Sequence, residues 1–96
     1  MKANWVSTIP VISTAHILPE TLKHLESMGG NAKYECGIFF FLGFDHPENW
    51  KECPDMVAVA TWFRRVYGED ENWIRFDQDG DLIEELPDHS AAWEKA

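Results

Sequence analysis

The sequence predicts an α+β fold, in which two helices pack on one face of a mixed sheet of about four strands. The elements follow the order βαβαββ and form a two-layer sandwich. Apolar side chains alternate along residues 34–44, as in a buried strand. Pro19 and Pro54 each precede apolar residues at helical spacing. Residues 78–80, Gln-Asp-Gly, form a turn signal. The 96 residues suit one domain covering 1–96.

The first strand and the first helix are expected in the first third of the chain. Residues 9–14 are predicted as a strand, with its Pro10 near the start or at a sheet edge. Pro19 suits the first turn of a helix, and apolar residues recur at helical spacing as far as Met28. The pair Gly29-Gly30 then ends this helix as a left-handed cap requires.

The segment 34–44 is predicted as the central strand. Its middle is apolar on both faces, so we expect it to be covered by neighbouring strands and by the helices. Phe39 and Phe41 belong to one face. The other face comprises Tyr34, Cys36, Ile38, Phe40, Leu42 and Phe44. The polar residues 45–53 that follow are predicted as a loop.

The second helix is expected to begin at Pro54 and to end at Gly68. Asp55 lies where a negative charge favours a helix start, and Arg64 and Arg65 suit its end. One stripe at helical spacing faces the sheet, and it comprises Met56, Val59, Ala60, Phe63, Val66 and Tyr67.

The last third of the chain is predicted as a hairpin followed by a short helix. Residues 72–77 alternate as a strand, and residues 81–86 return as its partner after the turn. Pro87 breaks the second strand. Asp88 or Ser90 then caps a helix over 91–94.

Negative charge is concentrated in this last third. The net charge of the chain is −9. Residues 1–68 contain seven acids and six bases, a net charge of −1, whereas residues 69–96 contain ten acids and two bases, a net charge of −8. Such a surface repels nucleic acid and anionic membranes and attracts basic protein surfaces. Solubility alone is the alternative explanation.

Catalytic signatures are weak. Ser13 and Cys36 are candidate nucleophiles beside a histidine such as His16, but no nucleophile-elbow, phosphate-loop or zinc-protease motif is present. The plainer interpretation is that Ser13 or Thr14 satisfies backbone groups where the strand meets the next element. We therefore expect no enzyme activity and no cofactor.

A metal site is a second possibility. The alternating acids of residues 77–81 resemble the start of a calcium-binding loop, but Leu82 occupies the position that requires glycine. Asp45 and His46 offer further ligands together with Cys53 or His16. A small metal-binding module or metal-dependent enzyme therefore stays open as an alternative.

Cysteine usage and hydropathy indicate the compartment. Cys36 and Cys53 lie in or beside apolar stretches and are expected to be buried free thiols rather than a disulfide. The N-terminus lacks the apolar core of a signal peptide, and the longest apolar run, 38–42, is too short to span a bilayer. We expect a cytoplasmic protein in a bacterial host cell.

An aromatic surface is expected on the face of the sheet opposite the helices, where Phe39, Phe41 and Trp73 would lie. A second possibility is that the C-terminal segment 91–93 folds back over these rings. In the first case the patch would suit a protein interface.

Two stretches carry a resemblance to a known family: Val11-Ile12-Ser13-Thr14-Ala15-His16, and Trp73 to Asp81 followed by Leu86-Pro87. Over roughly residues 9–88 the chain resembles an uncharacterised domain-of-unknown-function family of small acidic proteins. Its members are carried on bacterial plasmids, prophages and integrative elements. The resemblance implies a mobile-element setting, in which small acidic proteins often inhibit host defence, sometimes by imitating the charge of DNA. It implies no catalytic residue.

The leading hypothesis is a non-enzymatic protein-binding protein of phage or mobile-element origin. It would inhibit a host defence complex of CRISPR or restriction type by occupying its basic surface, as a monomer or homodimer and without binding nucleic acid or membranes. A third possibility is an antitoxin-like or structural partner subunit that binds through the aromatic patch. The candidate partner-binding residues are Glu69, Asp70, Glu71, Asp77, Asp79, Asp81, Glu84 and Glu85, with Phe39, Phe41 and Trp73.

Overall fold

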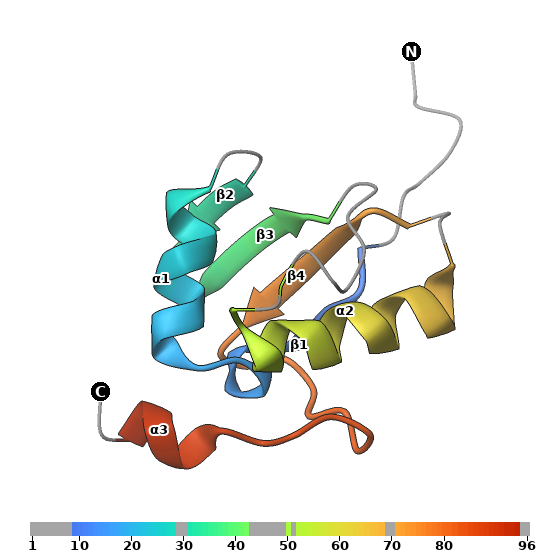
Figure 1. Cartoon of the computed structure of the whole chain (residues 1–96). Coiled ribbons are helices and arrows are strands. Elements are labelled where there is room, and N and C mark those ends of the chain that lie inside the picture. The colour runs from blue at the N-terminus through green and yellow to red at the C-terminus, as the bar shows by residue number, and fades with distance from the viewer. Residues whose placement is uncertain (1–8, 29–30, 43–49, 51, 69–70, 95–96) are drawn as a thin grey trace.

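A four-stranded mixed sheet with helices on one face makes up the computed structural model, which describes residues 9–28, 31–42, 50, 52–68 and 71–94 (Figure 1). The strands are β1 (Val11–Ser13), β2 (Asn31–Tyr34), β3 (Gly37–Phe41) and β4 (Trp73–Asp77). The helices are the short 3-10 helix η1 (Thr14–His16), α1 (Pro19–Ser27), α2 (Pro54–Tyr67) and α3 (Ser90–Glu94). The predicted α+β class is thereby confirmed.

The strands lie in the order β1-β4-β3-β2, so the last strand in the sequence occupies the interior of the sheet. β4 pairs in parallel with β1 and antiparallel with β3. Phe76 lies between Ile12 of β1 and Ile38 of β3 in this register. The parallel β1–β4 pair is possible because the long connection between them includes both main helices.

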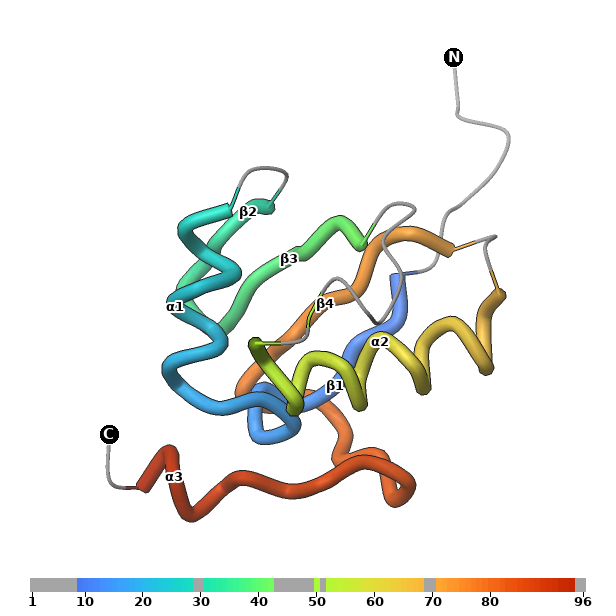
Figure 2. Tube along the Cα trace, viewed as in Figure 1, coloured from blue at the N-terminus to red at the C-terminus, as the bar shows by residue number. Residues whose placement is uncertain are grey.

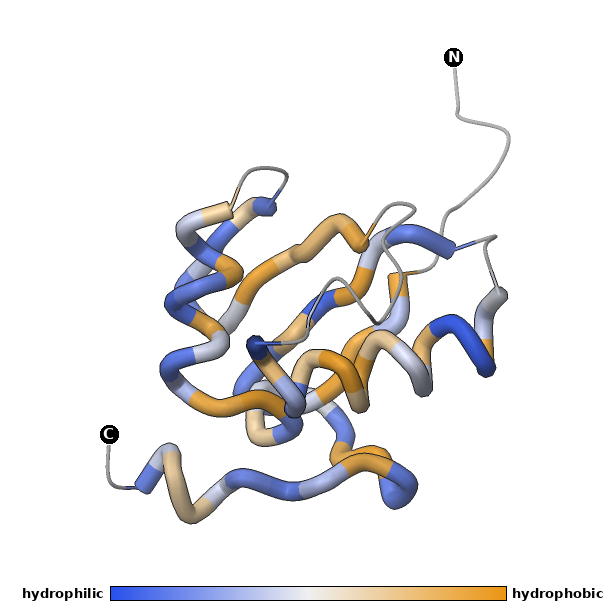
Figure 3. Tube along the Cα trace, viewed as in Figure 1, coloured by the Kyte–Doolittle hydropathy of each residue, from blue (hydrophilic) through white to orange (hydrophobic). Residues whose placement is uncertain are grey.

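The core lies between the sheet and the helices α1 and α2, which both cover the same face (Figure 1). Phe40, Phe63 and Phe76 are the largest fully buried side chains. Figure 3 shows hydrophobic residues along β3 and at intervals along α2. The fully buried residues also include Ile12, Leu25, Ile38, Met56, Val59 and Ile74. This arrangement buries the predicted stripe of α2 only in part, because Val66 stays half exposed.

Local signals set the ends of the helices where they were predicted. α2 begins at Pro54 and ends before Gly68, whose φ of +64° favours glycine. α1 begins at Pro19, while Gly29 and Gly30 lie outside the described residues. α3 begins at Ser90, where Asp88 Oδ1 accepts a hydrogen bond from the Ser90 amide, 2.8 Å away.

The segment predicted as one strand over 34–44 is two strands, which corrects the sequence prediction. Glu35 and Cys36 form a tight turn, so that Tyr34 pairs with Gly37 across a hairpin. A Cβ atom at Gly37 would lie 1.8 Å from the carbonyl oxygen of Phe76. The glycine is therefore required by the close approach of β4, a contact that the local alternation does not reveal. Residues 43 and 44 lie outside the described residues.

The predicted hairpin partner at 81–86 is also wrong. Only Asp81 makes a strand-like bridge, and that bridge joins Ile12 of β1 rather than β4. Both edges of β4 are already occupied by β1 and β3, so no edge remains for a returning strand. Gly80 lets the chain pass close to the Ile12 backbone, and the following residues run past the end of the sheet to α3, at the bottom of the view in Figure 2.

Candidate functional site

Residues 78–94, here named the acidic strap, contain six of the exposed acids of the described structure. The strap contains no lysine or arginine. Its acids are Asp79, Asp81, Glu84, Glu85, Asp88 and Glu94, and all six are exposed. Figure 3 shows hydrophilic residues along this part of the chain, interrupted by hydrophobic ones. The strap therefore presents six carboxylates along one continuous segment.

Backbone hydrogen bonds attach the strap to β1 and η1. The Ser13 amide donates to the Asp81 carbonyl at 2.9 Å, and the His89 amide donates to the Ala15 carbonyl at 2.7 Å. At its far end the indole Nε1 of Trp93 donates to the Ile17 carbonyl at 2.9 Å. These contacts lie along the whole length of the strap, so its carboxylates are displayed from an ordered backbone rather than a loose tail.

A buried histidine completes the attachment. His16 is 1% exposed, and its Nε2 accepts a hydrogen bond from the Ile83 amide at 2.8 Å. Because Nε2 accepts, the network places the proton on Nδ1, which donates to the Pro87 carbonyl at 2.7 Å. A neutral imidazole thus holds both sides of the 83–87 turn. The sequence suggested His16 only as a candidate for catalysis or metal binding, so this structural role was not predicted.

The opposite face of the sheet from α1 and α2, here named the open face, carries the predicted aromatic residues. Phe41 and Trp73 are paired in the register of β3 and β4, and their rings lie 5.1 Å apart. They are 41% and 38% exposed. Trp93, expected as a possible cover, instead lies against η1. Phe41 and Trp73 therefore form an exposed aromatic pair, with the half-buried Phe39 beside them.

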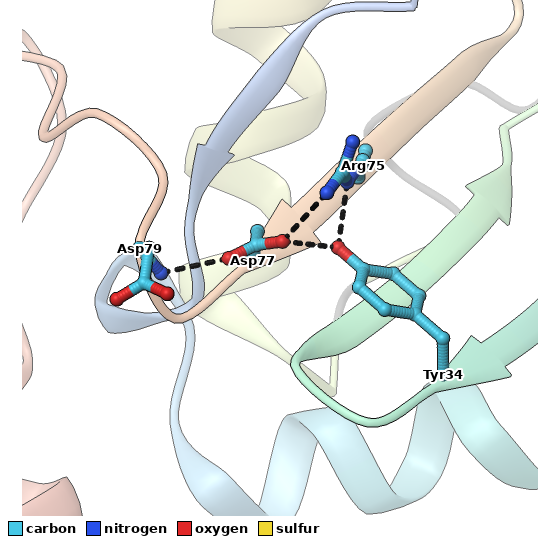
Figure 4. Close-up of polar contacts among 4 residues, drawn as sticks. All are labelled: Tyr34, Arg75, Asp77 and Asp79. Atoms are coloured by element: carbon cyan, nitrogen blue, oxygen red, sulfur yellow. Dashed lines mark hydrogen bonds and ion pairs between the residues drawn. The ribbon is translucent and has the colours of Figure 1, made fainter.

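At one end of the open face a polar network surrounds Asp77 (Figure 4). Tyr34 donates from its hydroxyl to Asp77 Oδ2 at 2.5 Å, and Arg75 Nη2 donates to the same oxygen at 2.9 Å. Arg75 Nε also donates to the Tyr34 hydroxyl at 2.6 Å. The remaining oxygen, Asp77 Oδ1, accepts from the Asp79 amide at 2.8 Å.

This network changes the proton affinities of its members. The hydrogen bond from Tyr34, followed by that from the Asp79 amide, holds the pKa of Asp77 below its usual value. Burial raises the pKa of Tyr34, and its bond to Asp77 adds to the effect. The Arg75 guanidinium also lies over the rings of Tyr34 and Phe39, at 5.1 and 5.5 Å from their centroids. Asp77 is thus a buried, paired carboxylate, so it is not displayed to a partner.

The other predicted acids divide into several environments. Asp79, Asp81 and Glu84 are exposed on the strap. Glu85 is exposed too, but it forms an ion pair with Arg65 of α2. Glu71 is half-buried just before β4. Two more predicted residues, Glu69 and Asp70, lie outside the described residues.

Ser13 and His16, two of the residues considered for nucleophilic chemistry, have structural roles here. Ser13 Oγ accepts from the Ala15 amide at 3.0 Å and caps η1, which agrees with the plainer interpretation. His16 has both ring nitrogens bonded to backbone groups of the strap. Cys36 and Cys53 are free thiols, but both are half-buried rather than buried as expected. Burial raises the pKa of Cys53, with Asp55 adding to the effect, so the thiolate is disfavoured at that position.

In the described part of the chain, no group of three or more His, Cys, Asp or Glu residues is arranged to hold a metal ion. Asp77 is committed to Tyr34 and Arg75, while Asp79 and Asp81 are exposed on the strap. Asp45 and His46 lie outside the described residues.

Comparison with protein families gives a match over most of the chain. A model described as the C-terminal domain of a family of unknown function, DUF5983, matches residues 9–91. The chain belongs to this family. The matched part of the DUF5983 domain runs from just before β1 into α3, so it includes the open face, the network around Asp77 and most of the acidic strap.

Two further searches, one of curated proteins and one of solved structures, found no match to this DUF5983 chain. The family match agrees with the resemblance to a domain-of-unknown-function family. Within the described residues, no helix has the length and apolar character needed to cross a membrane.

Proposed function

We propose that this DUF5983 protein is a non-enzymatic binding protein of phage or mobile-element origin. Its acidic strap occupies a basic surface on a host defence complex of CRISPR or restriction type and inhibits it. The observation that carries the proposal is the strap itself, in which six exposed carboxylates and no lysine or arginine lie on a segment fastened to β1 and η1.

Electrostatics favour this class of partner. A segment with six carboxylates and no fixed positive charge attracts a surface rich in lysine and arginine, and it accelerates the encounter. Proteins that handle nucleic acid present such surfaces to phosphate groups. The same charge repels nucleic acid, so the strap would compete for the basic surface instead of joining the complex on DNA.

The fastening of the strap favours recognition over solubility. A disordered acidic tail would lose conformational entropy when it bound a partner. Here His16, Ser13 and Ala15 already fix the backbone of the strap through hydrogen bonds. Solubility alone does not need this order, because a loose tail would serve it equally well.

A charge-reversal experiment tests the proposal. Asp81→Lys with Glu84→Lys changes the net charge from −9 to −5, since two residues each change by two units. The matched control, Glu20→Lys with Glu52→Lys, makes the same change at exposed positions outside the strap. We expect the wild type and the control to raise phage plaquing on hosts that carry restriction or CRISPR systems, and the strap variant to lose this effect.

Two results would contradict the proposal. If the folded strap variant protects phage as well as the wild type does, the strap is not the inhibitory surface. If neither the wild type nor any variant affects a panel of purified restriction enzymes and CRISPR complexes, the defence target is wrong. Inhibition that weakens as salt rises from low to physiological concentration is expected, because the contacts are between exposed charges.

A second candidate function rests on the open face. Phe41 and Trp73 form an exposed aromatic pair, which is typical of a site that another protein covers. In this case the protein is an antitoxin-like or structural partner subunit, and its complex would persist at high salt. Phe41→Ser with Trp73→Ser would then break the complex in size-exclusion chromatography with light scattering, whereas the strap variant would leave it intact.

A further inference from the structure

A cavity of about 570 Å³ opens at the end of the sheet where β1, β2 and β4 finish. Its lining includes residues of α1 and residues of the strap, among them Trp93 and Glu94 of α3. Residues of the turn between β2 and β3 line it as well. This volume lies within the range of pockets that hold small ligands or inserted side chains. It lies at a different end of the molecule from the Phe41–Trp73 pair.

The lining combines an apolar wall with carboxylates. Leu22 of α1 and Leu82 of the strap contribute aliphatic surface, and Trp93 contributes its indole. The indole is held in place by the bond from Nε1 to the Ile17 carbonyl, so the polar edge of the ring is already satisfied. The charged residues of the lining are Glu26, Lys33, Glu35 and Glu94.

Charge in the cavity is unbalanced. Lys33 Nζ lies 3.4 Å from Glu26 Oε2, so that these two charges offset each other. Glu35 and Glu94 are both exposed, and within the described residues no ion pair involves either of them. Three acids against one base leave a net charge of −2 in the lining.

We propose that this cavity receives an arginine side chain of the partner protein. The guanidinium pairs with Glu35 and Glu94 and stacks on Trp93. A planar, weakly hydrated cation suits an aromatic wall beside carboxylates better than the compact, strongly hydrated ammonium of lysine does. This inference rests on the proposed function and gives it a specific anchor: the strap supplies long-range attraction, and the cavity selects a single arginine.

Direct binding of a small probe tests the cavity. Acetyl-arginine methylamide is titrated into ¹⁵N-labelled protein, with the lysine and the neutral citrulline analogues as comparisons. We expect the arginine probe to shift the Trp93 indole resonance and backbone amides along the cavity, the lysine probe to do so more weakly, and citrulline not at all. Equal shifts from citrulline, shifts centred on Trp73, or no shift at millimolar probe overturn the proposal.

Matched variants then assign the binding to the carboxylates. Glu35→Gln with Glu94→Gln should weaken the arginine probe by up to about fivefold for each carboxylate lost. Glu20→Gln with Glu52→Gln removes the same charge at exposed positions away from the cavity and should leave the affinity unchanged. Because all four side chains are exposed, folding is expected to be preserved in both variants. Equal affinities in the two variants overturn the proposal.

The phage assay separates this inference from the proposed function. If the arginine probe fails to bind while Asp81→Lys with Glu84→Lys abolishes protection, the cavity proposal falls and the strap function stands. If the probe binds as expected but the wild type protects no phage, the cavity stands and the defence function falls. A loss of protection in Glu35→Gln with Glu94→Gln supports both together.

Discussion

At the scale of single residues, His16 connects segments that lie far apart in the sequence. Its two ring nitrogens bond the Ile83 amide and the Pro87 carbonyl, while the ring itself is 1% exposed. A buried donor or acceptor without a partner costs about 1–3 kcal/mol. The strap therefore depends on this one side chain more than on any of its own exposed residues.

Replacing this ring with a hydrocarbon tests the dependence. His16→Phe keeps the shape of an aromatic ring but leaves the Ile83 amide and the Pro87 carbonyl unpaired. We expect the free energy of unfolding in urea to fall by about 2–4 kcal/mol. We also expect hydrogen exchange at the Ile83 amide to accelerate. The exposed His24→Phe should change stability by less than about 0.5 kcal/mol, so equal effects of the two variants would contradict the assigned role.

A second residue-scale prediction concerns Asp77, whose pKa is lowered first by the hydrogen bond from Tyr34. Tyr34→Phe should raise the pKa of Asp77 in carboxyl ¹³C NMR titrations. The sign for stability follows, because a carboxyl group with a depressed folded pKa stabilises above its unfolded pKa and loses that contribution as the pH falls through the folded value. The acid-dependent loss of stability should therefore shrink in Tyr34→Phe.

The matched control for this titration is Tyr67→Phe, which removes a hydroxyl from α2, on the other side of the sheet. It should leave the pKa of Asp77 where it is in the wild type. An unchanged pKa in Tyr34→Phe, or equal rises in both variants, would show that the Tyr34 hydroxyl does not set the proton affinity of Asp77.

At the scale of elements, α2 shows what local signals can determine. Both of its ends agree with the prediction, since Pro54 and Gly68 act within their own helix. The hairpin β2–β3 could not be found in the same way. The alternation that is typical of a single strand continues through Glu35 and Cys36, so no turn is indicated there. The need for Gly37 arises only from its contact with β4, forty residues later in the sequence.

Alanine substitutions at Gly37 and Gly68 distinguish a steric clash with a neighbouring strand from a strained backbone conformation. Gly37→Ala would place a Cβ atom 1.8 Å from the Phe76 carbonyl oxygen, so we expect a loss of more than about 3 kcal/mol or failure to fold. At Gly68→Ala the φ of +64° is strained, but no atom lies within 4 Å of the new Cβ. We expect a smaller loss there, about 1–3 kcal/mol, in thermal and urea unfolding. The reverse ranking would contradict the observed packing of β3 against β4.

The candidate site, like the fold, could be predicted from the sequence only in part. Composition alone indicated an acidic C-terminal third, and the exposed positions of Asp79, Asp81 and Glu84 agree with it. Asp77 is instead buried and paired with Arg75. Arg75 lies two residues earlier on the same face of β4, and this strand spacing could have suggested the pair. The hydrogen bonds from His16 to the strap could not be predicted from the neighbouring sequence, because their partners lie 67 and 71 residues away.

At the scale of the whole molecule, charge opposes folding while packing favours it. A net charge of −9 on 96 residues produces self-repulsion, and much of it comes from the strap. Added salt screens exposed charges beyond about 10 Å at 0.1 M. Stability and the proposed partner binding should therefore respond to salt in opposite directions.

Thermal unfolding at increasing salt checks this balance. We expect the Tm of the wild type to rise with sodium chloride, because screening reduces repulsion among the acids. Asp81→Lys with Glu84→Lys should have an equal or higher Tm and a weaker response to salt. A lower Tm in this variant would mean that the strap carboxylates stabilise the fold, and its effect on partner binding would then have to be attributed to folding.

The position of β4 has a consequence for how the protein is made. β4 lies between β1 and β3, yet it is the last strand in the sequence, and Val11 pairs with Arg75. During synthesis the ribosome releases β1 long before its parallel neighbour exists, so the sheet closes only when nearly the whole chain has emerged. A nascent or prematurely terminated chain would expose the strands that β4 joins, and cellular proteases would remove it before incomplete chains accumulated.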